Sequence, residues 1–143
     1  MATIWQQQPR LEQLKALGSN TLVEHLGIEF LELGEDWIKA RMPVDRRTHQ
    51  PHGILHGGAS VALAETLGSV AANLCVDSSR KRCVGLEINA NHVRAVRAGY
   101  VVGIARPLHL GAATQVWDIR IATEAGKAVC ISRLTLAVLD AER

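Results

Sequence analysis

A single carboxyl group, that of Glu65, stands in a long apolar stretch of the sequence, GGASVALAETLGS. If this stretch is a helix, the residues one turn away are Val61, Ala62, Gly68 and Ser69, none of them positively charged. An unpaired acid in apolar surroundings costs free energy, and its pKa rises. Such a carboxylate is suited to attack a carbonyl carbon or to activate a water that the Ser69 hydroxyl holds. A glutamate that simply faces solvent is the alternative that the sequence leaves open.

The residues before this stretch predict a second reactive feature, an open helix N-terminus. Helices usually begin after Ser, Thr, Asp or Asn, whose side chains cap the first amides. Here His56 precedes Gly57 and Gly58, so no standard cap is present and the first N–H groups are expected to stay open. Open amides at this end of a helix bind anions or polarise a carbonyl oxygen, to which His56 and Gln50 can also donate. Tight packing is the alternative role of the glycines.

The spacing of the two features predicts a dimer. Gly57 and Glu65 are eight positions apart, which places them about 12 Å from each other along one helix. One carbonyl carbon does not reach both groups, so the amide and the carboxylate of a single active site are expected to come from different subunits. Two such helices, antiparallel across a two-fold axis, would form two equivalent sites.

Other catalytic arrangements find little support in the sequence. His49, His52 and His56 lie in a proline-containing loop with an HxxHxxxH spacing that has no strong ligand geometry, so no metal is expected. Ser60 and Ser69 lack the GxSxG context of a nucleophilic serine, and no cysteine adjoins a histidine.

Composition narrows the partners and the compartment. The net charge is +2 and the basic residues are scattered, so no nucleic-acid partner is expected. Cys75, Cys83 and Cys130 are odd in number and form no CxxC, as in a protein with reduced thiols. The N-terminus MATIWQQQPR has no signal-peptide pattern, and no apolar run approaches the roughly 20 residues of a membrane span. A cytoplasmic protein without a membrane partner is expected.

The elements that must position these residues are those of one α+β domain over residues 1–143. The long helix is predicted at 57–76, with Leu63, Leu67, Val70 and Leu74 as its buried stripe. It is too apolar for one buried side, which again points to a second subunit. Four later runs are predicted as strands joined by short links, which favour antiparallel neighbours. The predicted elements are a short helix at 10–17, strands at 25–33 and 37–44, the long helix, and strands at 82–93, 100–110, 114–123 and 127–139.

Several stretches resemble the hotdog-fold acyl-CoA thioesterases, in the branch that includes the 1,4-dihydroxy-2-naphthoyl-CoA and enterobactin proofreading thioesterases. These stretches are HLGIEF, MPVDRRTHQPHGILHGGASVALAETLGS, VGLEINANHVR and PLHLG, and the likeness covers nearly the whole chain. The resemblance implies one long central helix wrapped by a roughly six-stranded antiparallel sheet. It also implies a homodimer, and commonly a homotetramer built as a dimer of dimers.

The resemblance further assigns roles to individual residues. It makes Glu65 the nucleophile or general base, places the Gly57 amide on the thioester carbonyl with Gln50 and His56, and lets Ser69 position water. Coenzyme A, as part of the substrate rather than a cofactor, is expected along Leu86, His92, Val93, Arg94, Ala95, Val96, Leu110, Gly111, Ala112, Ala113, Thr114 and Gln115.

The chain departs from the branch at a few of these positions. Val93 follows His92 where the branch often has a second histidine, and Ala112 stands in place of an arginine. Arg94 and Arg97 are basic residues that could compensate, and a solvated turn is the alternative role for both.

The expected reaction is hydrolysis of an acyl-CoA to a free acid and coenzyme A. The resemblance favours an aromatic acyl group, with a medium-chain aliphatic acyl-CoA or carrier-protein thioester as the alternative. A hotdog hydratase or dehydratase is a weaker alternative, because its usual His-plus-acid pair on the long helix is missing. A non-catalytic acyl-CoA-binding module would have little need of an acid at Glu65.

Overall fold

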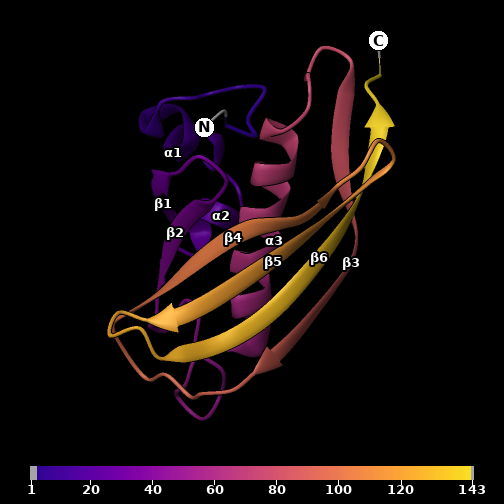
Figure 1. Cartoon of the computed structure of the whole chain (residues 1–143). Coiled ribbons are helices and arrows are strands. Elements are labelled where there is room, and N and C mark those ends of the chain that lie inside the picture. Colours follow the sequence, from indigo (N-terminus) through magenta and orange to yellow (C-terminus); the bar gives the residue numbers. More distant parts are fainter. Residues whose placement is uncertain (1–2, 143) are drawn as a thin grey trace.

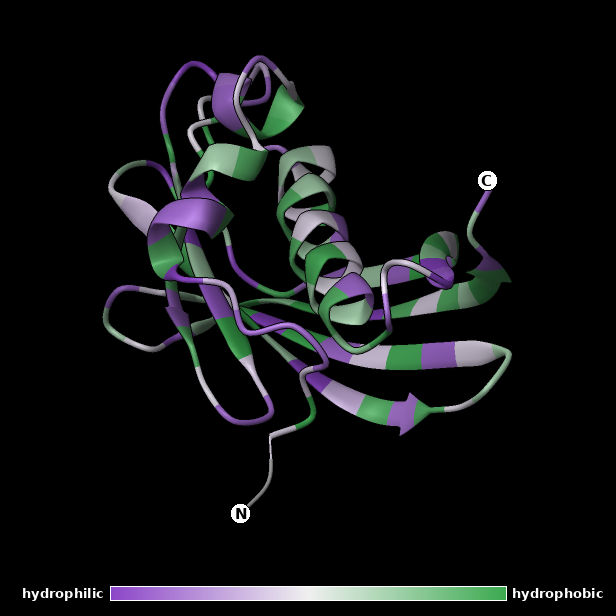
Figure 2. Ribbon diagram, turned by 90° about the horizontal axis from the view of Figure 1, so that it is seen from above, coloured by the Kyte–Doolittle hydropathy of each residue, from purple (hydrophilic) through white to green (hydrophobic). Residues whose placement is uncertain are grey.

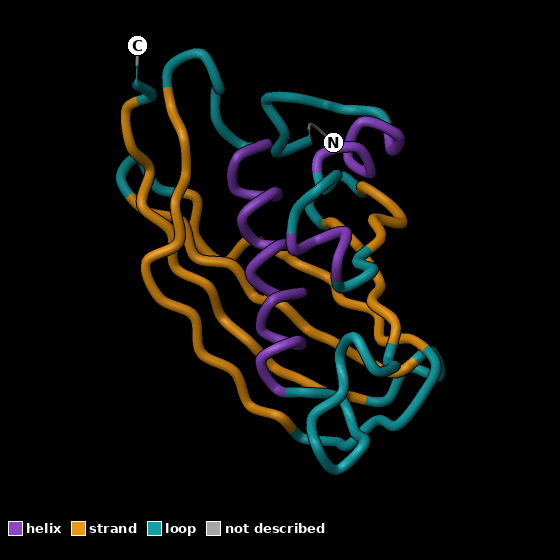
Figure 3. The backbone as a smooth tube through the Cα atoms, turned by 180° about the vertical axis from the view of Figure 1, so that it is seen from behind, coloured by secondary structure: helices purple, strands orange, loops and turns teal. Residues whose placement is uncertain are grey.

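Six antiparallel strands curl around one long helix in the computed structural model, which describes residues 3–142 (Figure 1). The strand order in the sheet is β1-β2-β4-β5-β6-β3, and α3 runs along one face of it (Figures 1 and 3). This arrangement confirms the expected α+β architecture. The elements are α1 Leu11–Leu17, α2 Leu22–His25, β1 Glu29–Leu33, β2 Ile38–Pro43, α3 Gly57–Leu74, β3 Lys81–His92, β4 Tyr100–Leu110, β5 Thr114–Thr123 and β6 Ala128–Asp140.

The long helix α3 is held against the sheet by leucine and alanine side chains. Leu63, Leu67 and Leu74 are buried, as expected, together with Ala64 and Ala71 on the same side. The hydropathy colours of Figure 2 show that most of α3 is apolar. Within residues 3–142, no helix has both the length and the apolar character needed to cross a membrane.

A second side of α3 is neither buried nor fully exposed. It is half-buried at Val61, Ala62, Glu65, Ser69 and Val70. The sequence predicts Val70 in the buried stripe of this helix, but the residue lies on the half-buried side instead of facing the sheet. This is the side on which the carboxylate lies.

Leu67 tests the contribution of the α3–sheet packing to stability. Its side chain is completely buried and lies against Gly103 of β4, where an added methyl group would overlap it. We expect Leu67→Ala to lower the free energy of unfolding by about 3 kcal/mol, because it removes buried methyl groups and leaves a cavity. Urea denaturation measures this loss. The matched change Leu22→Ala, at a side chain that is 61% exposed, should cost less than about 0.5 kcal/mol.

The place of β3 in the sheet differs from the expectation. The short link predicted between the strands at 82–93 and 100–110 would make them neighbours, but β3 pairs with β6 at the edge of the sheet. The link is longer than predicted, because β3 ends at His92 and residues 93–99 form no regular element. Seven extended residues reach about 23 Å, enough to cross the roughly 14 Å of three strand spacings to β4.

The first predicted strand is also too long. Residues 25–28 do not extend β1; instead His25 ends the short helix α2. The Thr21 hydroxyl caps that helix by accepting a hydrogen bond from the Val23 N–H. Gly27, with φ of +73°, terminates it, because glycine adopts this left-handed conformation without strain.

Candidate active site

The N-terminus of α3 is capped, but by an unusual residue. His56 Nδ1 accepts a hydrogen bond from the Gly58 N–H at 2.8 Å, so the expectation of wholly uncapped amides is wrong. The ring is placed to do this because His56 is extended, with its backbone fixed by a hydrogen bond to the Thr48 carbonyl at 2.8 Å. The Ala59 and Ser60 amides donate to the His56 carbonyl. Of the first four amides of α3, those of Gly58, Ala59 and Ser60 have acceptors, and that of Gly57 has none among the described residues.

A hollow of about 470 Å³ adjoins this free amide. We call it the amide hollow. In the loop that forms one side, the Gln50 side-chain carbonyl accepts from the His52 N–H, which leaves the amide NH₂ of Gln50 able to donate. The structure thus brings Gln50 and Gly57 together, as the sequence predicts. The hollow is lined by Gln50, Ile54, Leu55, Gly57, Ser60, His92, Val93, Arg94, Ala95 and Val129.

Glu65 lies in a different hollow, of about 390 Å³, which we call the carboxylate hollow. Its Oε2 is buried and has no hydrogen-bond partner among the described residues. Loss of solvation raises the pKa of this carboxyl group above its ordinary value. The carboxyl group packs so closely on β3 that a side chain at Gly85 would overlap Oε1. The hollow is lined by Gly58, Val61, Ala62, Glu65, Gly85, Leu86, Glu87 and Ile88.

The two hollows have no lining residue in common, although the same strand contributes to both. β3 lines the carboxylate hollow with Gly85–Ile88 and, near its end, the amide hollow with His92. A single chain therefore holds an unpaired carboxylate and an unpaired amide in two separate places. Neither hollow contains both groups that the proposed chemistry needs.

Ser69 and Val96 lie outside both hollows. Ser69 is half-buried one turn beyond Glu65, in a further hollow of about 390 Å³ with Val70 and Asn73. Val96 is buried in the core, and its carbonyl accepts from the Leu55 N–H. Its side chain is therefore turned away from solvent.

The predicted coenzyme A segment at the β4–β5 turn lies apart from the two hollows as well. Leu110 is exposed at the end of β4, while Gln115 is buried, and its side-chain carbonyl accepts from the Trp117 indole at 2.9 Å. Between these two residues, Gly111, Ala112 and Ala113 form the turn and Thr114 begins β5, and none of the four lines either hollow.

Gly85 is the most informative site residue that the sequence reasoning missed. A glycine inside a strand often marks a bulge or a close approach, and here the β3–β6 register shifts between Gly85 and Glu87. That signal was present in the sequence. The helix residues Val61 and Ala62 could also have been found, because they precede Glu65 by one turn on the same side.

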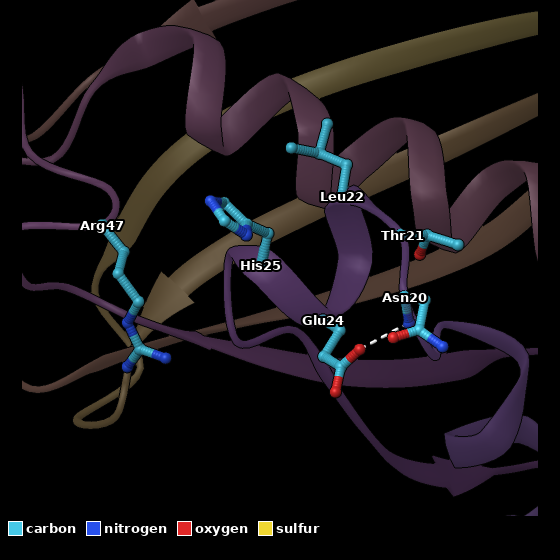
Figure 4. A pocket seen from close by; sticks show the side chains of 6 residues that line it. All are labelled: Asn20, Thr21, Leu22, Glu24, His25 and Arg47. Atoms are coloured by element: carbon cyan, nitrogen blue, oxygen red, sulfur yellow. Dashed lines mark hydrogen bonds between the residues drawn. The ribbon is translucent and has the colours of Figure 1, made fainter.

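A larger hollow, of about 810 Å³, lies elsewhere, beside α2 (Figure 4). Its charged groups are already engaged: the Arg47 guanidinium pairs with Asp45 at 2.7 Å, and the Glu24 carboxylate accepts from the Asn20 N–H. His25 completes the polar side of the hollow (Figure 4). Unlike Oε2 of Glu65, none of this hollow's side-chain nitrogen and oxygen atoms is both buried and without a hydrogen-bond partner among the described residues.

The described part of the chain contains no cluster of side chains that could bind a metal ion. Within residues 3–142, no group of three or more His, Cys, Asp or Glu side chains is placed to hold a metal ion. Cys83 and Cys130 are buried and Cys75 is half-buried, and burial raises the pKa of each thiol. They are therefore poor nucleophiles.

The chain is similar to known proteins over nearly its whole length. The family model of the thioesterase superfamily matches residues 52–130. The 1,4-dihydroxy-2-naphthoyl-CoA hydrolase of Escherichia coli K12 is 54% identical, over 95% of this chain and 99% of that protein. The proofreading thioesterase EntH of Cronobacter turicensis is 55% identical, over 95% and 98%. The crystal structure of a mutant of the Pseudomonas aeruginosa thioesterase PA1618 superposes with a TM-score of 0.96, at 54% identity and 97% and 100% coverage.

Family and fold follow from these matches. The chain belongs to the thioesterase superfamily, and its sheet wrapped around α3 is the hotdog fold of that family. The protein is a thioester hydrolase.

Proposed function

We propose that this protein hydrolyses acyl-CoA thioesters to the free acid and coenzyme A, with Glu65 as nucleophile or general base. The observation that carries the proposal is the unpaired, half-buried carboxylate of Glu65 in a hollow beside the helix that bears a free Gly57 amide. The E. coli relative whose name gives its substrate acts on an aromatic acyl-CoA, which supports an aromatic acyl group here. We propose that the reaction takes place in the cytoplasm, because Cys75, Cys83 and Cys130 are free thiols and the cytoplasm keeps thiols reduced.

In the proposed reaction, the Gly57 N–H donates to the thioester carbonyl oxygen and stabilises the negative charge that develops there. One such donor is worth about 3 kcal/mol in the transition state. His56 Nδ1 already accepts from the Gly58 N–H, so in the neutral ring Nε2 carries the proton. His56 does not line the amide hollow, and we propose that its Nε2–H donates to the same oxygen when substrate is bound. The Gln50 amide is the third donor.

Glu65 then acts by one of two routes. As a nucleophile, it attacks the carbonyl carbon, the C–S bond breaks, coenzyme A leaves as a thiolate, and water hydrolyses the acyl-glutamyl anhydride. As a general base, it takes a proton from a water whose oxygen attacks the carbonyl carbon directly. The C–S bond then breaks, and coenzyme A leaves as a thiolate. Thiolate is a good leaving group, so neither route needs a strong general acid.

We further propose that each active site combines the carboxylate hollow of one subunit with the amide hollow of another. β3 supports this arrangement because it is an edge strand that lines both hollows. If two copies of β3 paired antiparallel about a two-fold axis near Ala90, Gly85–Ile88 of one copy would lie beside the segment from His92 to Ala95 of the other. Exposed Leu86 and Val93 would then be covered. The homodimer is the minimal assembly, and a homotetramer would be a dimer of dimers.

The substrate assignment is tested by the rates of hydrolysis of a set of thioesters. We expect kcat/KM for benzoyl-CoA and 1,4-dihydroxy-2-naphthoyl-CoA to exceed that for octanoyl-CoA at least about tenfold. Release of the thiol, followed with a thiol-reactive dye, measures each rate. A preference for octanoyl-CoA, or for octanoyl carrier protein, would favour the aliphatic alternative. Binding of all the esters without turnover would identify a binding module instead.

A further inference from the structure

The side-chain amide of Asn73 connects α3 to the edge strand β3. Its Oδ1 accepts from the Cys83 N–H at 2.8 Å, and its Nδ2 donates to the Cys83 carbonyl at 3.1 Å. Nδ2 also donates to the Ser69 carbonyl of its own helix at 2.8 Å. By pairing with both backbone groups of one strand residue, this amide takes the place that the peptide group of a neighbouring strand would occupy. β3 is thus held at Cys83 by the helix itself.

All hydrogen bonds between α3 and β3 in the described residues involve Cys83. Two are those with Asn73, and in the third the Cys83 thiol donates to the Ala72 carbonyl at 3.6 Å. In the sheet, β3 is bonded only to β6, because it lies at the edge. Without the Asn73 amide, the distance between β3 and α3 would be set only by side-chain packing and by the hydrogen bond of the Cys83 thiol.

That distance matters for Glu65. Cys83 and Gly85 are two positions apart on β3, so both are oriented toward α3, and Gly85 is the residue on which the Glu65 carboxyl group packs. The β3–β6 register shifts directly after Gly85, so Leu86 has no partner on β6 and the ladder is interrupted next to this point. Because Glu65 Oε2 has no hydrogen-bond partner, any movement of β3 away from α3 would admit water to the carboxylate.

We propose that Asn73 is a positioning residue for thioester hydrolysis: its amide fixes the start of β3 on α3 and thereby holds the β3 backbone against the Glu65 carboxyl group. This inference rests on the proposed role of Glu65. Asn73 itself does not line the carboxylate hollow, and its side-chain hydrogen bonds do not involve Glu65. It acts through the strand.

The test uses Asn73→Ala and Asn73→Leu, the second of which keeps the approximate volume but forms no hydrogen bond. With benzoyl-CoA as substrate, we expect kcat to fall on the order of tenfold, because the carboxylate loses its fixed position. KM should stay within about threefold. The acidic limb of the kcat/KM pH profile should move to lower pH, because added solvation lowers the raised pKa of the Glu65 carboxyl group.

The pH profile can be interpreted because few charged groups adjoin Glu65. Glu87 of β3 is the other titratable residue that lines the carboxylate hollow, and it is exposed and bonded to Asn89. From α3, the lining residues Gly58, Val61 and Ala62 are uncharged.

Gln7→Ala is the matched control. The Gln7 side-chain amide donates to the Asn73 and Val76 carbonyls at 3.3 and 3.2 Å, so its loss also weakens the end of α3, yet it makes no bond to β3. We expect a similar loss of thermal stability with kcat and the acidic limb unchanged. A purely structural role for Asn73 would make its variants behave like Gln7→Ala.

Two results would overturn the proposal. One is an acidic limb at the wild-type position in both Asn73 variants. The other is a rise in KM alone that grows with the size of the acyl group, which would show direct contact with substrate. If Glu65→Gln itself retains wild-type turnover, then the proposed function fails. If Glu65→Gln is inactive but the acidic limb of the pH profile is unshifted in the Asn73 variants, the proposed function stands. Only the positioning role of Asn73 is then rejected.

Discussion

Replacement of Glu65 by glutamine is expected to lower kcat for acyl-CoA hydrolysis by about 10³-fold, the range of a lost general base or nucleophile. Glutamine keeps the shape of the side chain and fits the same hollow, but it neither attacks a carbonyl carbon readily nor accepts a proton. KM should change little, because Glu65 does not supply the binding of coenzyme A. Thiol release under saturating benzoyl-CoA measures the effect.

The pH dependence of the wild-type protein gives a second measure of the same residue. Burial raises the pKa of the Glu65 carboxyl group above its ordinary value, and the reaction needs the ionised form. The rate should therefore fall as the pH is lowered through a pKa higher than that of an ordinary glutamate. The acidic limb should be absent from the residual activity of Glu65→Gln.

The thermal stability of the Glu65→Gln protein shows whether a fall in its activity comes from lost catalysis or from lost structure. A carboxyl group whose pKa is raised by folding favours the folded state most below its unfolded pKa, and that contribution is lost as the pH rises through the folded pKa. At neutral pH the ionised, unpaired carboxylate therefore disfavours folding, and Glu65→Gln should unfold at a temperature equal to or higher than that of the wild type. Glu32→Gln, at a half-exposed carboxylate on β1 paired with Lys39, should keep full activity. Wild-type turnover by the Glu65→Gln protein would exclude the proposed chemistry.

The two routes for Glu65 differ in the fate of solvent oxygen. In a single turnover in ¹⁸O-labelled water, the general-base route puts the label into the acid product. The nucleophilic route, when water attacks the glutamyl carbon of the anhydride, leaves the label in the protein. Mass spectrometry of the product and of the peptide that contains Glu65 distinguishes them.

Much of the fold could be predicted because its elements have regular patterns. The spacing of Leu63 and Leu67 marks α3 as a helix, and the alternation of Trp117, Ile119 and Ile121 marks β5 as a strand with one buried face. The position of β3 could not be predicted in this way. Which edge of a sheet a strand joins depends on long-range packing, and the seven residues after His92 are long enough for more than one topology.

The sequence singles out two groups of the candidate site but does not predict the geometry around them. Glu65 and Gly57 stand out by residue type and spacing alone. The cap formed by His56 depends on the orientation of an imidazole ring, for which the sequence has no reliable signal. The contact of Glu65 with Gly85 joins two residues that are distant in sequence, so it follows only from the folded structure.

The Gly57 amide can be removed with little change to the helix, by the substitution Gly57→Pro. Gly57 is the first residue of α3, where proline is well tolerated, and His56 before it is already extended, with φ of −70° and ψ of 130°. The lost N–H has no acceptor in the described structure, so folding loses no hydrogen bond. We expect kcat to fall about 10²- to 10³-fold, as for the loss of one oxyanion donor.

Gly57→Ala separates the donor from the bulk of the new side chain. A methyl group at this position would lie 2.9 Å from His92 Nε2, at the far end of an exposed and movable ring. Because alanine retains the N–H, we expect Gly57→Ala to keep most of the wild-type kcat. An equal loss of kcat in both variants would mean that the shift of His92, rather than the amide, controls the rate.

Mixed dimers of the two inactive variants test whether the active site is shared between subunits. Consider a dimer of one Glu65→Gln chain and one Gly57→Pro chain. If each site takes its carboxylate from one chain and its amide from the other, one of the two sites carries both changes and the other carries neither. Random reassembly of equal amounts yields about one half mixed dimers, so the mixture should regain about one quarter of the wild-type activity. If each chain supplied both groups of its own site, every site would carry one change, and unfolding and refolding the variants together would restore nothing.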